Sequence, residues 1–147
     1  MDNINRRLEE FFREYEARFN RALAGTVDAE ATANAFADCF IEANPSGVLC
    51  GKNDDQFRNI IPQGYEFYKK IGTKSMSIDS VKISLLDEYH SMAKVHWHAL
   101  YGKSDGSEER IEFDVIYFVQ ILEEKPKIFA YITGDEQGVL REKGLIP

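Results

Sequence analysis

Residues 92–101 read MAKVHWHALY. Small or apolar side chains occupy every second position, at Ala93, Val95, Trp97, Ala99 and Tyr101. A repeat of two is the side-chain period of a β-strand, so we expect this set to face a core and the alternate set to face outward. The outward set includes Lys94, His96 and His98, which we expect in water or at a contact between two copies of the chain. We therefore assign no metal site to these histidines.

The two-residue period continues on both sides of this stretch. It predicts a strand over residues 74–85 with a slip near Ser80, a long strand over 111–122 and a returning strand over 127–133. Asp105-Gly106 marks a hairpin turn between two of these strands. Long consecutive strands joined by short turns favour an antiparallel sheet that is covered on one face.

Helical spacing dominates the first half of the chain. Residues 3–24 carry one continuous apolar stripe, and Asp28 is a good N-cap for a second helix that ends at Asn44-Pro45. Residues 48–50 suggest a short edge strand, and 54–72 a third helix in which Pro62 opens a fresh helix at its first turn. A short helix over 136–143 follows Asp135. Helices first and strands afterwards indicate an α+β fold.

Composition excludes several classes of protein. The 147 residues suit one domain, 1–147, and the net charge of −7 argues against binding nucleic acid or an anionic membrane surface. Two cysteines are too few for a disulfide scaffold, and the arginines near the N-terminus are not followed by an apolar segment, so we expect a cytoplasmic protein. We expect no cofactor.

Two stretches carry a resemblance to a known superfamily. Residues 36–45, FADCFIEANP, are similar without a gap to the segment FADDATVEDP of ketosteroid isomerase, and Glu14-Tyr15 looks like an Arg-Tyr pair in that enzyme's first helix. Residues 128–136, IFAYITGDE, resemble the last strand and helix cap of bacterial SnoaL-like proteins. Both groups belong to the nuclear transport factor 2-like superfamily.

The resemblance implies a cone: a strongly bent antiparallel sheet covered by three N-terminal helices, with a pocket inside and an outer sheet face that forms a homodimer. It also exposes departures from the isomerase. The general-base aspartate falls on Asn44, whose amide cannot accept a proton at neutral pH, and the oxyanion-holding acid falls near Ile116. Asp114 lies two residues earlier on the same strand face, and Tyr15 matches directly.

These residues define the candidate site. Asp114 and Tyr15 are the candidate catalytic pair, as acid/base and oxyanion donor; the alternatives are that Asp114 is hydrated or pairs with Arg110 or a lysine, and that Tyr15 is a core phenol. Asn44 either orients a ligand or shapes a turn. The predicted pocket comprises Tyr15, Phe40, Asn44, Tyr68, Trp97, Asp114, Phe118, Phe129 and Tyr131.

Three functions remain open from the sequence. The first is a SnoaL-like protein that binds a small apolar or aromatic ligand in the cone. The second is an isomerase, cyclase or dehydratase that acts next to a carbonyl. The third is a dimeric interaction module with a filled core. Whether the protein is an enzyme is left undecided.

Overall fold

A strongly bent six-stranded sheet is the frame of the computed structural model, which describes residues 2–147. Its strand order is β2-β1-β6-β5-β4-β3. The strands are β1 (Phe36–Asn44), β2 (Gly47–Lys52), β3 (Thr73–Leu85), β4 (His90–Gly102), β5 (Glu108–Leu122) and β6 (Lys125–Ile132). All neighbours pair antiparallel except β1 and β6, which run parallel, so the sheet is mixed.

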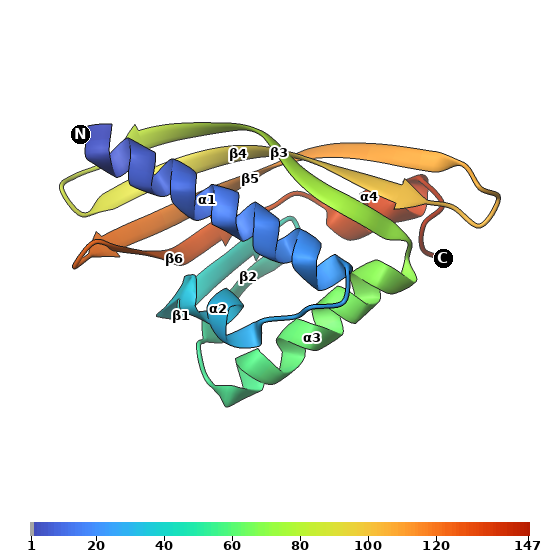
Figure 1. The fold of residues 1–147 in the computed structure, drawn as a ribbon, viewed down its shortest axis with the longest axis horizontal. Coiled ribbons are helices and arrows are strands. Elements are labelled where there is room, and N and C mark those ends of the chain that lie inside the picture. The colour runs from blue at the N-terminus through green and yellow to red at the C-terminus, as the bar shows by residue number, and fades with distance from the viewer. Residues whose placement is uncertain (1) are drawn as a thin grey trace.

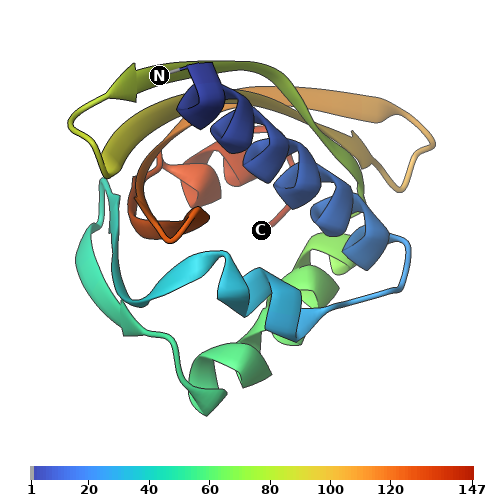
Figure 2. The ribbon, with the colours of Figure 1, turned by 60° about the vertical axis from the view of Figure 1, so that its left-hand side comes forward.

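Three N-terminal helices cover the concave face of the sheet, and a short helix follows the last strand. They are α1 (Asp2–Leu23), α2 (Ala29–Asn34), α3 (Asp55–Lys70) and α4 (Glu136–Glu142). Figure 1 shows α1 lying along the sheet, and Figure 2 shows α2 and α3 closing the opposite side of the cone. The predicted α+β cone is thereby confirmed. Within the described residues, no helix combines the length and apolarity needed to cross a bilayer.

The apolar stripe of α1 packs into the core as the sequence predicts, with Leu8 and Phe12 fully buried. A polar clamp fixes the helix to β3. The Asn20 side chain donates to the Met76 carbonyl oxygen at 2.7 Å and accepts from the Met76 N–H at 2.9 Å. Glu16 also accepts from the backbone N–H of Ile78. These bonds hold the C-terminal half of α1 against the N-terminal half of β3.

The prediction of one helix from Asp28 to Asn44 is wrong in its second half. Helix α2 ends at Asn34, and residues 36–44 form β1, paired with β2 and β6. The error has a geometric cause: Phe36 and Phe40 are four positions apart, and that spacing places two side chains on one face of either a helix or a strand. Both rings are buried and pack 5.1 Å apart. Hydrogen bonding to two neighbouring strands outweighs the helix propensity of the alanines.

The expectation that Pro62 opens a new helix is also wrong, because α3 runs without a break through this residue. Asp54 caps it by accepting from the Phe57 N–H at 2.9 Å. Pro62 is exposed, so its ring and missing N–H lie on the solvent side. Buried Ile61 and Tyr65 hold the helix against the core on both sides of the proline. The edge strand β2, the slip between Ile78 and Ser80 and the Asp135 cap of α4 are confirmed.

Candidate functional site

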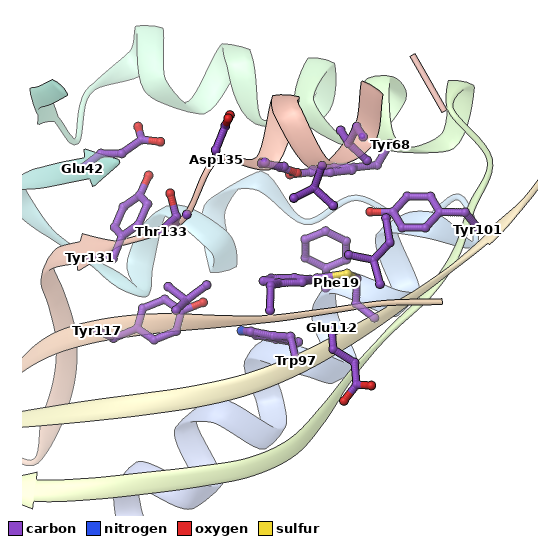
Figure 3. Close-up of a pocket in the computed structure, with 18 of the residues that line it drawn as sticks. Phe19, Glu42, Tyr68, Trp97, Tyr101, Glu112, Tyr117, Tyr131, Thr133 and Asp135 are labelled. Atoms are coloured by element: carbon purple, nitrogen blue, oxygen red, sulfur yellow. The ribbon is translucent and has the colours of Figure 1, made fainter. Parts of the chain in front are cut away.

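A cavity of about 300 Å³ lies between α1, the concave face of the sheet and α4. Side chains converge on it from every element except α2 and β2, and from the link after β6 (Figure 3). Aromatic residues are the largest group in its wall: Tyr15, Phe19, Tyr68, Trp97, Tyr101, Phe113, Tyr117 and Tyr131. Residues far apart in the sequence therefore meet because the sheet bends around them.

The inner wall is a connected group of rings. Tyr15 of α1 lies 6.1 Å from Trp97 of β4 and 6.0 Å from Tyr117 of β5, measured between ring centroids. Tyr117 in turn lies 6.3 Å from Tyr131 of β6. Such ring pairs favour offset or edge contacts, which hold the rings in fixed orientations. The wall is thus a preformed aromatic surface.

The phenol hydroxyls of this wall stay protonated. Burial raises the pKa of Tyr15 to about 12, and Arg18 and the Tyr117 hydroxyl only partly oppose the shift. Burial likewise raises the pKa of Tyr101 to about 12. The pKa values of Tyr117 and Tyr131 also rise, chiefly through burial and, for Tyr131, through the nearby Glu42 carboxylate. The Tyr117 and Tyr131 hydroxyls donate to Tyr15 and Glu42, so Tyr15 and Tyr101 are the two of these phenols that can donate a hydrogen bond to a ligand oxygen or nitrogen.

The charged side chains at the cavity are of one sign. Among the described lining residues the charged ones are carboxylates: Glu42, Glu112, Asp135 and Glu136. Glu136 accepts from the Tyr68 hydroxyl at 2.7 Å, and Asp135 accepts from the Gly138 N–H that it caps. Glu112 turns away from the cavity toward the outer face of the sheet (Figure 3). The guanidinium of buried Arg18 lies 5.6 Å from the Tyr15 ring centroid, and Arg18 does not belong to the lining.

Four predicted pocket residues line the cavity: Tyr15, Tyr68, Trp97 and Tyr131. Phe40 does not, because its ring packs in the core 5.0 Å from Phe57. Asn44 does not line it either. Its side chain accepts from the Ser46 N–H at 2.8 Å, which is the turn-shaping alternative at the β1–β2 hairpin.

The placement of Asp114 inside the cone is wrong. Asp114 is exposed on the outer face of β5, where its carboxylate lies 2.7 Å from His96 Nδ1 and 3.8 Å from Lys94 Nζ. The alternative that it pairs with a lysine is therefore correct. Phe118 lies on the same outer face, next to Phe129 at 6.1 Å between centroids, so neither ring lines the cavity.

The alternation of β5 carries the signal that could have placed Asp114 correctly. Odd positions from 111 to 119 are all apolar or aromatic, and Ile111, Val115, Tyr117 and Val119 are buried. The even set mixes Glu112 and Asp114 with apolar residues, so it is the poorer core face. The same alternation would have found Tyr117, a pocket residue that the sequence analysis missed. Glu42, Thr133 and Glu136 were missed because the fold alone brings them to the cavity.

These features define a class of protein: a single α+β cone with a preformed aromatic cavity. Residues 5–136 match the family described as NTF2-like protein (DUF6841), so the chain belongs to this family. The superfamily that the sequence resembles is thereby confirmed. A search of curated proteins finds no match.

Solved structures share this fold at low sequence identity. Aln2 from a Streptomyces species is 12% identical with a TM-score of 0.68, and 97% of each chain is covered. An NTF2-like superfamily protein from Salmonella enterica serovar Typhimurium is 15% identical with a TM-score of 0.65, covering 94% of this chain and 96% of the other. An NTF2-like protein with a cystatin-like fold from Novosphingobium aromaticivorans is 13% identical with a TM-score of 0.61, covering 100% and 97%. At such identities the likeness establishes the fold alone.

Proposed function

We propose that the protein binds a small aromatic molecule, neutral or cationic, in the cavity between α1 and the sheet. The observation that carries this proposal is the connected aromatic wall around a space of about 300 Å³. Concave, mostly apolar sites with a few polar groups are the usual form of small-molecule sites. An interaction module with a filled core would leave no such space.

The size of the cavity limits the ligand. An apolar cavity of about 150 Å³ holds one benzene molecule. The space here is twice that volume, which suits two fused rings with a short substituent. Flat rings would stack or make edge contacts with the partly exposed rings of Tyr15 and Tyr131, behind which Trp97 is buried.

The sign of the charge selects among aromatic ligands. Glu42, Asp135 and Glu136 line the cavity, Glu42 partly buried and the other two exposed, so an anionic ligand would meet like charges there. A neutral ligand avoids this repulsion. A ligand with an ammonium group gains attraction to the carboxylates and to the faces of the surrounding rings.

Catalysis next to a carbonyl with Asp114 as the acid/base has no support, because this carboxylate lies on the other side of the sheet from Tyr15. A general acid or base must come within hydrogen-bond reach of the proton that it transfers. We therefore propose binding as the function of the cavity.

The test is a calorimetric titration with three naphthalenes whose single polar substituent is neutral, cationic or anionic: naphthol, naphthylmethylammonium and naphthoate. We expect the first two to bind with one site per chain and naphthoate to bind at least about tenfold more weakly. Equal binding of all three would contradict the charge argument, and binding of none would overturn the proposal.

Adjacent substitutions locate the site. Thr133 lines the cavity, whereas its neighbour Ile132 is 43% exposed and does not. Thr133→Phe fills part of the space and should abolish naphthol binding, whereas Ile132→Phe should leave it unchanged. Equal loss in both variants would show that naphthol binds elsewhere.

A further inference from the structure

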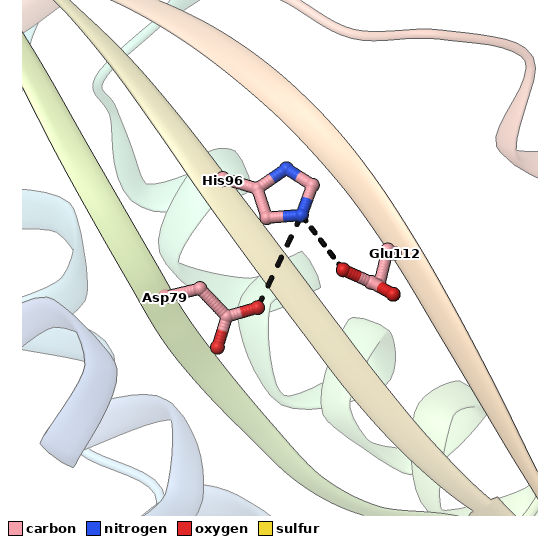
Figure 4. Close-up of side chains that lie close together, drawn as sticks. All are labelled: Asp79, His96 and Glu112. Atoms are coloured by element: carbon pink, nitrogen blue, oxygen red, sulfur yellow. Dashed lines mark hydrogen bonds and ion pairs between the residues drawn. The ribbon is translucent and has the colours of Figure 1, made fainter.

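The outer face of the sheet carries a second cluster, on the side opposite the cavity. Asp79 of β3, His96 of β4 and Glu112 of β5 lie side by side across three strands (Figure 4). One nitrogen or oxygen atom from each lies within 4.8 Å of the others. We propose that these three side chains bind a divalent transition-metal ion, for which zinc is the probe.

The orientation of His96 is the first argument. Its Nδ1 lies 2.7 Å from Asp114 Oδ1, so the ring donates its Nδ1–H to that carboxylate. Metal-binding histidines commonly have their second ring nitrogen held in this way by a carboxylate. Asp114 thereby directs the His96 Nε2 atom toward Glu112 and Asp79.

The atoms around Nε2 are the second argument. Nε2 lies 2.9 Å from Glu112 Oε1 and 4.0 Å from Asp79 Oδ2. In a neutral imidazole held through Nδ1–H, Nε2 is an acceptor, as are both carboxylates. Without a metal, a proton shared between Nε2 and Glu112 and the guanidinium of Arg110 balance the two carboxylates. A metal ion would displace that proton and bind all three acceptors. Ligand atoms of a tetrahedral zinc ion with bonds of ~2.0–2.1 Å lie about 3.3 Å apart, between the two observed distances.

A β-bulge supplies the third argument. The pairing of β3 with β4 passes from Ile78↔Trp97 to Ser80↔His96, so Asp79 is an extra residue in the strand. Bulges of this kind redirect a side chain and recur beside functional sites. Asp79 is also held by His98, whose Nδ1 lies 2.8 Å from Oδ1. The bulge thus adds a positioned carboxylate to the His96–Glu112 pair.

Arg110 is the cation that now lies nearest to both acidic ligands. Its guanidinium is 3.7 Å from Asp79 Oδ2 and 3.7 Å from Glu112 Oε2, and its side chain is half exposed. A metal ion and this guanidinium would compete for the same two carboxylates. Removing the charge of Arg110 should therefore tighten metal binding. If the cluster were only a structural ion-pair network, this substitution would break ion pairs without creating tighter zinc binding.

The experiment is a zinc titration of the metal-free full chain by calorimetry, repeated with cobalt to record the visible absorption of the bound ion. We expect one zinc per chain. His96→Gln and Glu112→Gln should each weaken binding by more than tenfold, and Asp114→Asn by about 10–100-fold through loss of the ring orientation. Arg110→Gln should tighten binding about fivefold or more.

His90→Gln is the matched control. His90 lies on the same strand and also pairs with an aspartate, Asp87 at 2.8 Å, but it lies outside the cluster. This variant should bind zinc like the parent chain. The proposal is overturned if a large excess of zinc gives no saturable heat, or if His96→Gln binds as tightly as the parent. Circular dichroism of each variant checks that it is folded. The two sites share only Glu112, whose carboxylate points to the outer face, so the result for His96→Gln does not depend on the cavity.

Discussion

Replacing Pro62 with alanine should stabilise the protein. Pro62 lies inside the continuous helix α3 and is exposed, so alanine can replace it without leaving a hole in the core. Alanine restores a backbone N–H at position 62, which can bond to the carbonyl of residue 58 in the preceding turn. It also removes the contact between the proline ring and that carbonyl.

The expected gain follows from two opposing effects. A proline in a helix interior is about 3 kcal/mol less favourable than alanine. Proline also restricts the unfolded chain, and losing that restriction lowers stability by about 0.4–1 kcal/mol. The net gain is about 2 kcal/mol in the free energy of unfolding. For a domain of this size that corresponds to a rise in Tm of about 4–8 °C.

Urea unfolding followed by the fluorescence of the single tryptophan, Trp97, measures this gain directly. Gly64→Ala is the companion variant: a Cβ at this exposed helical position meets no atom within 4 Å, so it should add about 1 kcal/mol. If the helix instead began anew at Pro62, proline would suit that first turn and its removal would give no gain. A stabilised Gly64→Ala beside an unchanged or weakened Pro62→Ala would refute the continuous helix.

Two further predictions concern the frame of the cavity. Asn20→Ala removes both bonds to the Met76 backbone and should lower the free energy of unfolding by about 1–3 kcal/mol. Asn20→Asp keeps the acceptor oxygen but turns a carboxylate oxygen toward the Met76 carbonyl, so it should lose at least as much; equal stability of all three chains would show that the clamp is unimportant. Stability should also fall as pH rises from about 10 to 12. Buried Tyr15 and Tyr101 keep their protons up to a pKa of about 12, whereas phenols of the unfolded chain lose theirs near 10, so the folded state binds more protons in this window. Urea unfolding at a series of pH values tests this, and a flat profile between these limits would contradict the burial of the two phenols.

Local periodicity was enough to predict most of the elements. The apolar positions around Trp97 fit only the period of a strand, and those of α1 fit only the period of a helix, so each pattern predicts one structure. The pair Phe36 and Phe40 fits both periods, and pairing with β2 and with β6, some ninety residues later in the chain, decides for a strand. Long-range pairing is not visible in a local pattern.

The site residues likewise divide into those that local periodicity predicts and those that only long-range strand pairing places. Trp97 was predicted correctly from the alternation of its own strand. Asp114 was misplaced because the resemblance located it only to within two residues of Ile116, and a shift of one residue exchanges the faces of a strand. Glu42 reaches Tyr131 only through the parallel pairing of β1 with β6. Dimerisation through the outer sheet face and a cytoplasmic location stay predictions.

The binding of an aromatic ligand inside the cone can be read from one signal. Trp97 is the only tryptophan in the sequence and lines the cavity, so its indole N–H gives a single indole cross-peak in a proton–nitrogen NMR spectrum. Titration with naphthol should move this peak progressively to a saturated position in the parent chain and leave it in place in Thr133→Phe. A peak that stays fixed in the parent chain at saturating naphthol would contradict the account.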